Sequence, residues 1–467
     1  MHASGNDQGG DQGFLGIGWA LHPDVEYLTI SRRLIEDEAD FFEINPEALW
    51  RPLIQHGKTI GLERSEFHET FAAIARSSGK PFVAHGLGLS LATGLFDLSS
   101  DPSHSAEANR TATWLDRVAS DASVFDFLWY SEHLGVTRAG GLNAGLPLPI
   151  PFTADVARDV VDKLRRMSDV VPVVAFENSA NMFWLCPPAA SRDGLSADHV
   201  AREEANFLCT ILEAADCRLL LDIHNVWVES VNLGFDPFEF VDRLPLDRVL
   251  EIHLSGGSDS DPSWLASGRE FRIDSHDGSV PEPCWELLDH VLPRCVHLRG
   301  VVLERLNGTF TAEHVDGLVE EMQRARSACR APRDASRGPH GPIRPLPRGG
   351  DFEALSKFVV GALVDPDPMS RLELPPRTLS DDSLGALATM DSDGFAVTGL
   401  VVRKLRFERL YRACDEARRA FDTDPGAFVE MFESYERQVP ATAWFPEEEA
   451  VLFEHWLEQW RGGTERT

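Results

Sequence analysis

The chain has 467 residues, 43% hydrophobic and 25% charged, which is typical of a soluble globular protein with one large domain and room for a smaller one. Its net charge of −31 argues against a general nucleic-acid-binding protein, because phosphate contacts require clustered Lys and Arg. There is no apolar run of the ~20 residues that cross a bilayer, no signal-peptide pattern and no Cys-x-x-Cys pair among the seven cysteines, so we expect a cytoplasmic protein with no membrane partner.

Short apolar runs alternate with longer amphipathic segments between residues 14 and 326, after a polar stretch at 1–13 that we expect to be a disordered lead-in. The apolar runs lie at 16–19, 40–44, 81–86, 125–133, 170–178, 218–225, 248–256 and 300–306. The helix-like segments between them include 66–78, 153–168, 197–214 and 285–292. This alternation predicts an α/β fold with a buried parallel sheet, most simply a (β/α)8 TIM barrel. A doubly wound open sheet is the alternative, but no G-x-G-x-x-G opens a helix.

The last part of the chain has a different character. Residues 327–350 are rich in Pro, Gly and Arg, and they predict an exposed linker. Residues 351–467 carry apolar positions at helical spacing with Asp, Pro and Gly between them, and they predict a mostly helical accessory module.

Ionisable side chains follow nearly every predicted strand, at the edge where chemistry gathers in a TIM barrel. The strand-end residues are His85, Glu132, Glu177, Asp222, His253, Asp274, His276 and Glu304, with His133, Asn178, His224 and Asn225 close to them in the sequence. The run at 40–44 adds Glu43. A single His or Glu at a strand end is usually a core residue, a helix cap or half of an ion pair. Several carboxylates converging in one barrel mouth would be costly through burial and mutual repulsion, and bound cations remove that cost.

The mixture of imidazoles and carboxylates favours a borderline metal such as iron, manganese or zinc over calcium or magnesium. More than one ion is expected from about four His and four carboxylates. Other catalytic patterns are absent from the sequence, including a G-x-S-x-G elbow, a Walker loop and H-E-x-x-H. The residues alone therefore predict a metal-dependent barrel and leave the reaction open.

The order of these motifs along the chain resembles that of the xylose isomerase/endonuclease IV-like barrels. It is more similar to one branch of them, the multinuclear non-heme iron-dependent oxidative enzymes (the MNIO, or MbnB/TglH-like, family). The segments that carry the resemblance are "DFFEINPE", "HGLGLSLATG", "SEHLG", "FENSAN", "LLLDIHNVWVESVNLGFDP", "EIHLSG", "IDSHDGSVPEPCWELL" and "VLERL". They are spread over residues 14–326.

The resemblance implies two or three iron ions of mixed Fe(II)/Fe(III) valence, O2 as co-substrate, and oxidation of a ribosomally synthesised precursor peptide at Cys, Asp or Asn. It implies eight metal ligands: His85, Glu132, Glu177, Asp222, His253, Asp274, His276 and Glu304. The other five residues, Glu43, His133, Asn178, His224 and Asn225, are interpreted as additional ligands or as residues that orient ligands. The family's usual partner is a separate protein that recognises the precursor's leader, and residues 351–467 could be a fused equivalent, a lid over the barrel mouth or a structural addition.

Three positions depart from the family pattern. His224 stands where an Asn is usual, Leu233 stands where a His is common, and no Trp-Asp follows Glu304. These departures leave the iron count and the substrate open. A divalent-metal sugar isomerase or epimerase, an endonuclease-like phosphodiesterase and a non-catalytic metal-binding scaffold are the rival predictions. The strong negative charge weakens the second of them.

Overall fold

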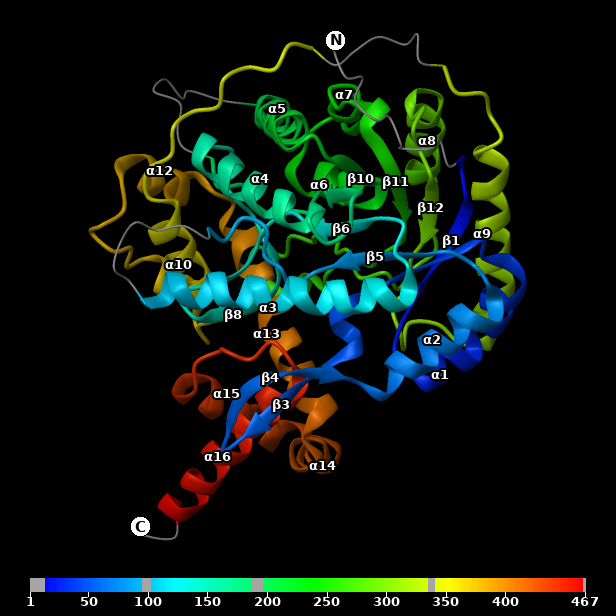
Figure 1. Cartoon of the computed structure of the whole chain (residues 1–467). Coiled ribbons are helices and arrows are strands. Elements are labelled where there is room, and N and C mark those ends of the chain that lie inside the picture. The colour runs from blue at the N-terminus through cyan, green and yellow to red at the C-terminus, as the bar shows by residue number, and fades with distance from the viewer. Residues whose placement is uncertain (1–12, 95–101, 187–195, 335–340, 465–467) are drawn as a thin grey trace, which may run out of the picture.

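Eight apolar runs form parallel strands that close into a barrel in a computed structural model describing residues 13–94, 102–186, 196–334 and 341–464. The barrel order is β1-β12-β11-β10-β9-β6-β5-β2, with each strand next to its chain neighbour among the barrel strands (Figure 1). The strands are β1 (Gly16–Leu21), β2 (Phe41–Ile44), β5 (Phe82–Gly86), β6 (Tyr130–His133), β9 (Val174–Glu177), β10 (Arg218–Asp222), β11 (Val249–Leu254) and β12 (Gly300–Leu303). The predicted (β/α)8 barrel is confirmed, whereas the expected lead-in lies almost wholly outside the described residues.

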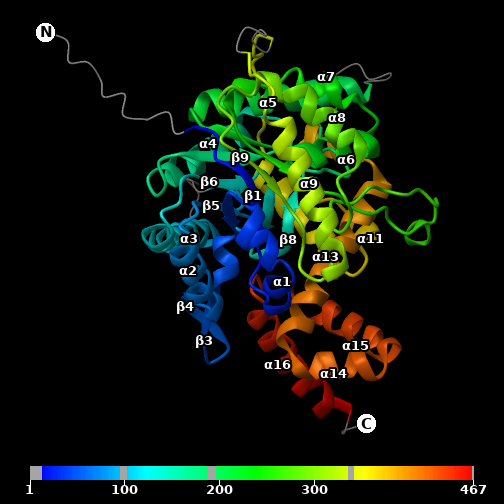
Figure 2. The same ribbon diagram turned by 90° about the vertical axis from the view of Figure 1, so that its right-hand side faces the viewer.

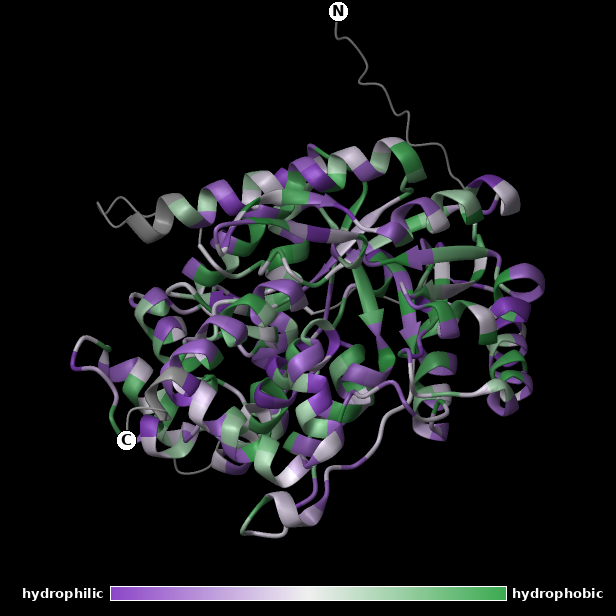
Figure 3. Cartoon of the chain, turned by 90° about the horizontal axis from the view of Figure 1, so that it is seen from below, coloured by the Kyte–Doolittle hydropathy of each residue, from purple (hydrophilic) through white to green (hydrophobic). Residues whose placement is uncertain are grey.

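Helices surround the barrel and cover the outer faces of its strands (Figures 1 and 2). They are α1 (Val25–Ile30), α2 (Glu66–Ser78), α3 (Pro102–Phe125), α4 (Ala154–Ser168), α5 (Ala197–Ala215), α6 (Ile223–Leu233), α7 (Pro237–Val241), α8 (Glu282–Val291) and α9 (Val315–Ala328). Short turns of 3-10 or π helix are η1 (Leu34–Glu38), η2 (Pro46–Leu49), η3 (Leu246–Arg248), η4 (Pro262–Trp264), η5 (Leu292–Arg294) and η6 (Ala312–His314). The apolar stripe of each amphipathic helix packs on the strands. The helices in Figure 3 alternate between green and purple along their length, as such stripes require.

The interior of the barrel has an apolar layer beneath a polar one. Residues paired in a parallel ladder point to the same face, and every second residue of a strand shares that face. Phe41, Val83, Trp129, Leu220 and Val302 pack together inside the barrel. Two residues further along the same strands, the inward side chains are polar: Glu43, His85, Ser131, Asp222 and Glu304. Because the paired strands are in register, these polar side chains all lie at the C-terminal mouth of the barrel.

Two antiparallel hairpins extend from this mouth, and the strand pattern of the sequence did not predict them. The first, β3 (Trp50–Gln55) with β4 (Lys58–Arg64), follows β2. The second, β7 (Val136–Ala139) with β8 (Leu142–Leu148), follows β6. Both hairpins contact the C-terminal helices.

The C-terminal part is helical, as expected, and lies on the side of the barrel that bears the two hairpins (Figures 1 and 2). Its helices are α10 (Phe352–Leu363), α11 (Pro368–Leu372), α12 (Asp381–Thr389), α13 (Ser392–Ala413), α14 (Asp415–Thr423), α15 (Pro425–Gln438) and α16 (Pro446–Thr464). Leu355, Val360, Phe395 and Val402 belong to the same continuous apolar core as the barrel. A separate core forms where α14, α15 and α16 meet the end of α13.

The segment before α10 follows the outside of the barrel past α5 and α4 (Figure 1). Among its described residues, Arg344 forms an ion pair with Glu203 at 2.8 Å, and its backbone N–H donates to Asn206. The carbonyl of Pro347 accepts from the backbone N–H of Ala154 at the start of α4. This part of the predicted linker therefore has specific contacts with the barrel helices.

Candidate metal centre

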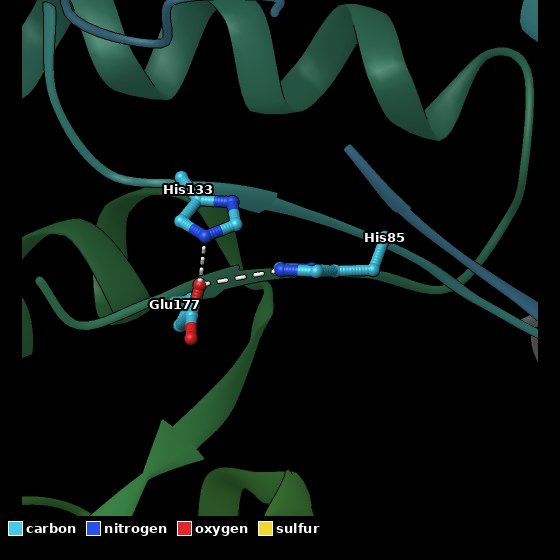
Figure 4. A group of neighbouring side chains, drawn as sticks. All are labelled: His85, His133 and Glu177. Carbon is cyan, nitrogen blue, oxygen red and sulfur yellow. Dashed lines mark ion pairs between the residues drawn. The ribbon is translucent and has the colours of Figure 1, made fainter. Parts of the chain in front are cut away.

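Three inward side chains on adjacent strands β5, β6 and β9 form the first group of potential ligands. The Nε2 atoms of His133 and His85 lie 2.8 and 3.3 Å from Oε2 of Glu177, and both rings face that carboxylate (Figure 4). One potential ligand atom from each of the three residues lies within 4.8 Å of the other two, which is close enough for all three to bind one ion. All three come from the polar layer at the C-terminal strand ends, as the sequence predicted for His85 and Glu177.

The two imidazoles of this group are held by their other nitrogen. His133 Nδ1 lies 2.9 Å from the carbonyl oxygen of Gly86, which can only accept a hydrogen bond. His85 Nδ1 lies 2.9 Å from Ser131 Oγ, and that hydroxyl already donates to the carbonyl of Ala84. Each Nδ1 therefore carries a proton, and each Nε2 is directed toward Glu177 in the orientation that metal ligation requires.

His253 lies at the centre of the second group. Its Nε2 is 3.0 Å from Glu43 Oε2, and its Nδ1 is 3.0 Å from Glu304 Oε2. The same Nδ1 is 3.7 Å from Glu177 Oε1 and 4.0 Å from Asp222 Oδ2. Glu43–His253–Glu304 and Glu177–Asp222–His253 both have the compactness of a metal site, so His253 and Glu177 are each shared between two groups.

Asp274 and His276 form a third cluster with His224. Oδ1 of Asp274 is 2.8 Å from both His224 Nδ1 and His276 Nε2, and His276 Nδ1 is 3.8 Å from Glu304 Oε2. His276 has a φ of 49°, a left-handed conformation uncommon outside glycine. The Asp-x-His pair thus adjoins the second group through Glu304.

The two asparagines have supporting positions. Asn178 pairs by its side-chain amide with both the N–H and the carbonyl of Asp222. Asn225 donates to Glu177 Oε1 at 3.3 Å and to the carbonyl of Asn178, while its own backbone N–H donates to Asp222 Oδ1. Asp222 is therefore the N-cap of α6, and its Oδ2 is left to face His253.

The donor set fits a cation. Burial, followed by the charges of Glu177 and Asp274, raises the pKa of Asp222 well above its usual range. Within the described part of the chain, Asp222 Oδ2 and His224 Nε2 are buried without a hydrogen-bond partner, which is costly in a protein interior. A positive ion in the Glu177–Asp222–His253 group would remove the cost of the unpaired Asp222 oxygen, and mixed N/O donors suit a first-row transition metal.

Glu132 is not part of this arrangement. It pairs in register with Phe176, whereas its neighbour His133 pairs with Glu177, so the two side chains point to opposite faces of the sheet. Glu132 accepts from the Tyr130 hydroxyl at 3.0 Å outside the barrel, and burial, then the charge of Glu47, raises its pKa well above the usual range. His133 thus occupies the position that the sequence assigned to Glu132.

Two further residues of the site were not singled out from the sequence. Ser131 orients His85, as described above. His22 directly follows β1 and is close enough to Glu304 and His276 for their charges to affect it, although burial is the main reason that its pKa falls to about 4. The sequence could have indicated His22, because alternate residues of a strand point to the same face and His22 lies two residues after the inward-facing Ala20.

Metal uptake should release protons from the metal-free chain. Burial alone would lower the pKa values of His133 and His276, but Glu177 beside the first and Asp274 beside the second raise both to about 10. Both rings are therefore protonated at pH 7 without metal, and an ion must displace those protons. We expect metal affinity to rise with pH between 6 and 8, by about tenfold per pH unit for each proton displaced. A dye-monitored anaerobic titration checks this, and uptake without proton release would contradict it.

Comparison with known proteins identifies relatives of the barrel part of the chain. Residues 15–330 match the model of a family described as "RiPP precursor modification enzyme MbnB/TglH/ChrH". A UPF0276 protein of Nitrosospira multiformis is 29% identical over 284 residues, which are 61% of this chain and 83% of that protein. A UPF0276 protein of Pseudomonas aeruginosa is 28% identical over 306 residues, 64% of this chain and 90% of that protein.

Solved structures with a similar fold are more distant. A xylose isomerase domain protein from Planctomyces limnophilus is 14% identical with a TM-score of 0.40, covering 68% of this chain and 99% of that one. Endonuclease IV from Thermus thermophilus is 17% identical with a TM-score of 0.36, covering 66% of this chain and 98% of that one.

Proposed function

Because the chain belongs to the MbnB/TglH/ChrH family of RiPP precursor modification enzymes, we propose that it oxidises a ribosomally synthesised precursor peptide at a multinuclear iron centre, with O2 as co-substrate. The modified residue in this proposal is Cys, Asp or Asn. The observation that carries it is a set of three compact ligand groups, in which Glu177–Asp222–His253 shares Glu177 with one neighbouring group and His253 with the other. A carboxylate shared between two groups is well suited to hold neighbouring ions together.

In this proposal His85, His133 and Glu177 hold one ion, and Glu177, Asp222 and His253 hold a second. Glu43, Glu304, Asp274 and His276 complete the second ion's surroundings or hold a third. Iron bound there would supply one-electron oxidation of the peptide and activation of O2. The protein's own contribution is to hold the ligands in place, through hydrogen bonds with Ser131, Gly86, Asn178 and Asn225. The apolar layer beneath the ligands excludes water from that side of the site.

The peptide would approach from the partly open side of the cluster. The side chains of His253, Glu177 and Asp222 are at most 2% exposed, whereas those of His133 and Asp274 are each 26% exposed. His133 lies on β6, and Asp274 lies in the connection after β11. A peptide side chain reaching the buried ligands would therefore pass between them.

The experiment that tests the function uses the anaerobically purified full-length chain, loaded with Fe(II), and a short Cys- or Asp-rich peptide encoded beside its gene. We expect the peptide's mass to change only when both iron and O2 are present. Turnover of a sugar without O2 would instead support the isomerase alternative. Full iron loading with no change in any neighbouring peptide would contradict the enzymatic proposal.

Ser131→Ala is expected to weaken metal binding by roughly 10-fold, because the loss of an outer hydrogen-bond partner usually costs 10–100-fold in metal affinity. The His85 ring would lose the hydroxyl that orients it. Competition with a chelator measures the change, and Ser123→Ala on the exposed end of α3 is the control. Equal affinity in both variants would mean that Ser131 does not orient a ligand.

The role of residues 351–467 in leader recognition stays a prediction. Across the described residues, no helix is both long enough and apolar enough to span a bilayer.

A further inference from the structure

A long connection, irregular apart from the short 3-10 turn η4, carries Asp274 and His276. It comprises residues 255–281, between β11 and α8, and is called the ligand loop below. Its two arms run antiparallel: the N–H of Ser260 donates to the carbonyl of Phe271 at 2.7 Å, and the N–H of Ile273 donates to that of Ser258 at 2.9 Å. Further hydrogen bonds within the loop, such as that from the N–H of Ser258 to Ser275 Oγ at 2.9 Å, hold the two arms to each other. Contacts with other elements fix the arms, and the two ligands they carry, relative to the barrel.

The first such contact is with α6. The side-chain amide of Asn232 accepts from the N–H of Arg272 and donates to its carbonyl, both at 2.8 Å. This pairing holds the returning arm of the ligand loop two residues before Asp274. It lies entirely within the barrel part of the chain.

The second contact links the ligand loop to the C-terminal helices. One guanidinium nitrogen of Arg269 donates to the backbone carbonyl of Asn232 at 2.6 Å, and another forms an ion pair with Asp391. The other carboxylate oxygen of Asp391 accepts from the N–H of Gly394 and caps α13. Arg269 therefore joins the ligand loop, α6 and the start of α13 at a single point.

Apolar contacts reinforce the same junction. Phe271 is fully buried and packs with Leu265, Met182 and Val397, and Ile273 packs against this cluster beside Asp274. A Cβ on Gly394 would lie 1.9 Å from the carbonyl oxygen of Met182, in the segment that follows β9. Only glycine therefore lets α13 pack this closely against that segment. Figures 1 and 2 show α13 on the side of the barrel from which α14–α16 project.

We propose that α13 positions Asp274 and His276 for metal through the Arg269–Asp391 ion pair, which makes the C-terminal module part of the construction of the metal centre. The inference rests on the proposed function, because it takes these two residues as ligands. Arg269 and Asp391 are positioning residues, since they act on the metal only through the ligand loop. Releasing the loop lets its two ligands sample other positions, and the ion nearest to them is then bound less tightly.

The test compares Asp391→Asn and Arg269→Gln with the wild-type full-length chain, loaded with Fe(II) under argon. Asn is as good an N-cap as Asp, so Asp391→Asn removes the charge and leaves α13 capped. Asp424→Asn is the matched control, because Asp424 caps α15 in the same module and faces no part of the ligand loop. Metal content, affinity for the weakest-bound ion, and hydrogen exchange across residues 270–278 are measured.

Both test variants should bind the weakest ion about 10-fold less tightly and exchange faster across residues 270–278. Asp424→Asn should match the wild type in both respects. The double variant should be no worse than Arg269→Gln alone, because that substitution already removes the ion pair with Asp391 together with the bond to Asn232. Wild-type affinity and exchange in both variants would overturn the inference and leave the proposed function intact. A wild-type chain that takes up no metal would overturn the proposed function, and the exchange data would still decide whether α13 holds the loop.

Discussion

Replacing Glu177 by Gln is expected to lower both metal affinity and peptide oxidation by roughly 100-fold or more. Loss of an outer partner of a ligand already costs 10–100-fold, and Glu177 belongs to two ligand groups at once. Burial would raise its pKa, but His133 and His85 hold it well below the usual range, so the residue is ionised where it lies. A neutral amide removes the charge that those two imidazoles and any bound cation face.

Glu132→Gln is the matched control for this substitution. Glu132 is equally buried and also lies on a neighbouring strand, but it faces the helices rather than the barrel interior. Burial raises the pKa of Glu132 and so favours its protonated form, which Gln closely resembles in shape. We expect this variant to retain wild-type metal content. Loss of metal from Glu132→Gln with full retention in Glu177→Gln would reverse the assignment of the two faces.

Phe395→Ala is expected to lower the free energy of unfolding by about 3–5 kcal/mol, the usual cost of removing a buried phenylalanine ring. Phe395 lies on α13, is fully buried, and packs edge-on against Phe183 with ring centroids 5.5 Å apart. Because Phe183 follows β9 and belongs to the barrel core, the loss should destabilise the barrel and the module together.

Denaturant unfolding followed by both tryptophan fluorescence and circular dichroism measures this effect. A single transition shifted to lower denaturant is the expected result. Two separate transitions, with only the lower one moved, would mean that the C-terminal module folds independently of the barrel.

Truncation after residue 350 would be a poor test of peptide binding, because it removes Leu355 and Val360 from a shared core.

The barrel could be predicted because its strands are buried on both faces, so their apolar runs stand out in the sequence. The hairpins β3–β4 and β7–β8 could not, because their strands mix apolar and polar residues with Gly and Pro, and because contacts with distant helices stabilise them. The sequence also could not predict that α10 and α13 bury apolar side chains in the same core as the barrel. Amphipathic helices show that they bury a face, but not against which partner.

The ligand groups could be predicted as a class more readily than as individual residues. In "SEHLG" two neighbouring residues, Glu132 and His133, can both bind metal, and only the phase of the strand decides which one faces inward. That phase follows from Trp129, which lies in the apolar layer inside the barrel two residues before Ser131. His224 and Asp274 lie 50 residues apart, and their contact depends on the path of the ligand loop.

Anomalous diffraction at the iron edge from crystals of the anaerobically purified chain tests the central claim most directly. We expect at least two peaks, one among His85, His133 and Glu177 and one among Glu177, Asp222 and His253. A further peak beside Asp274 and His276 would identify a third ion. Iron bound outside these groups, or crystals of active protein with no iron among them, would contradict the account.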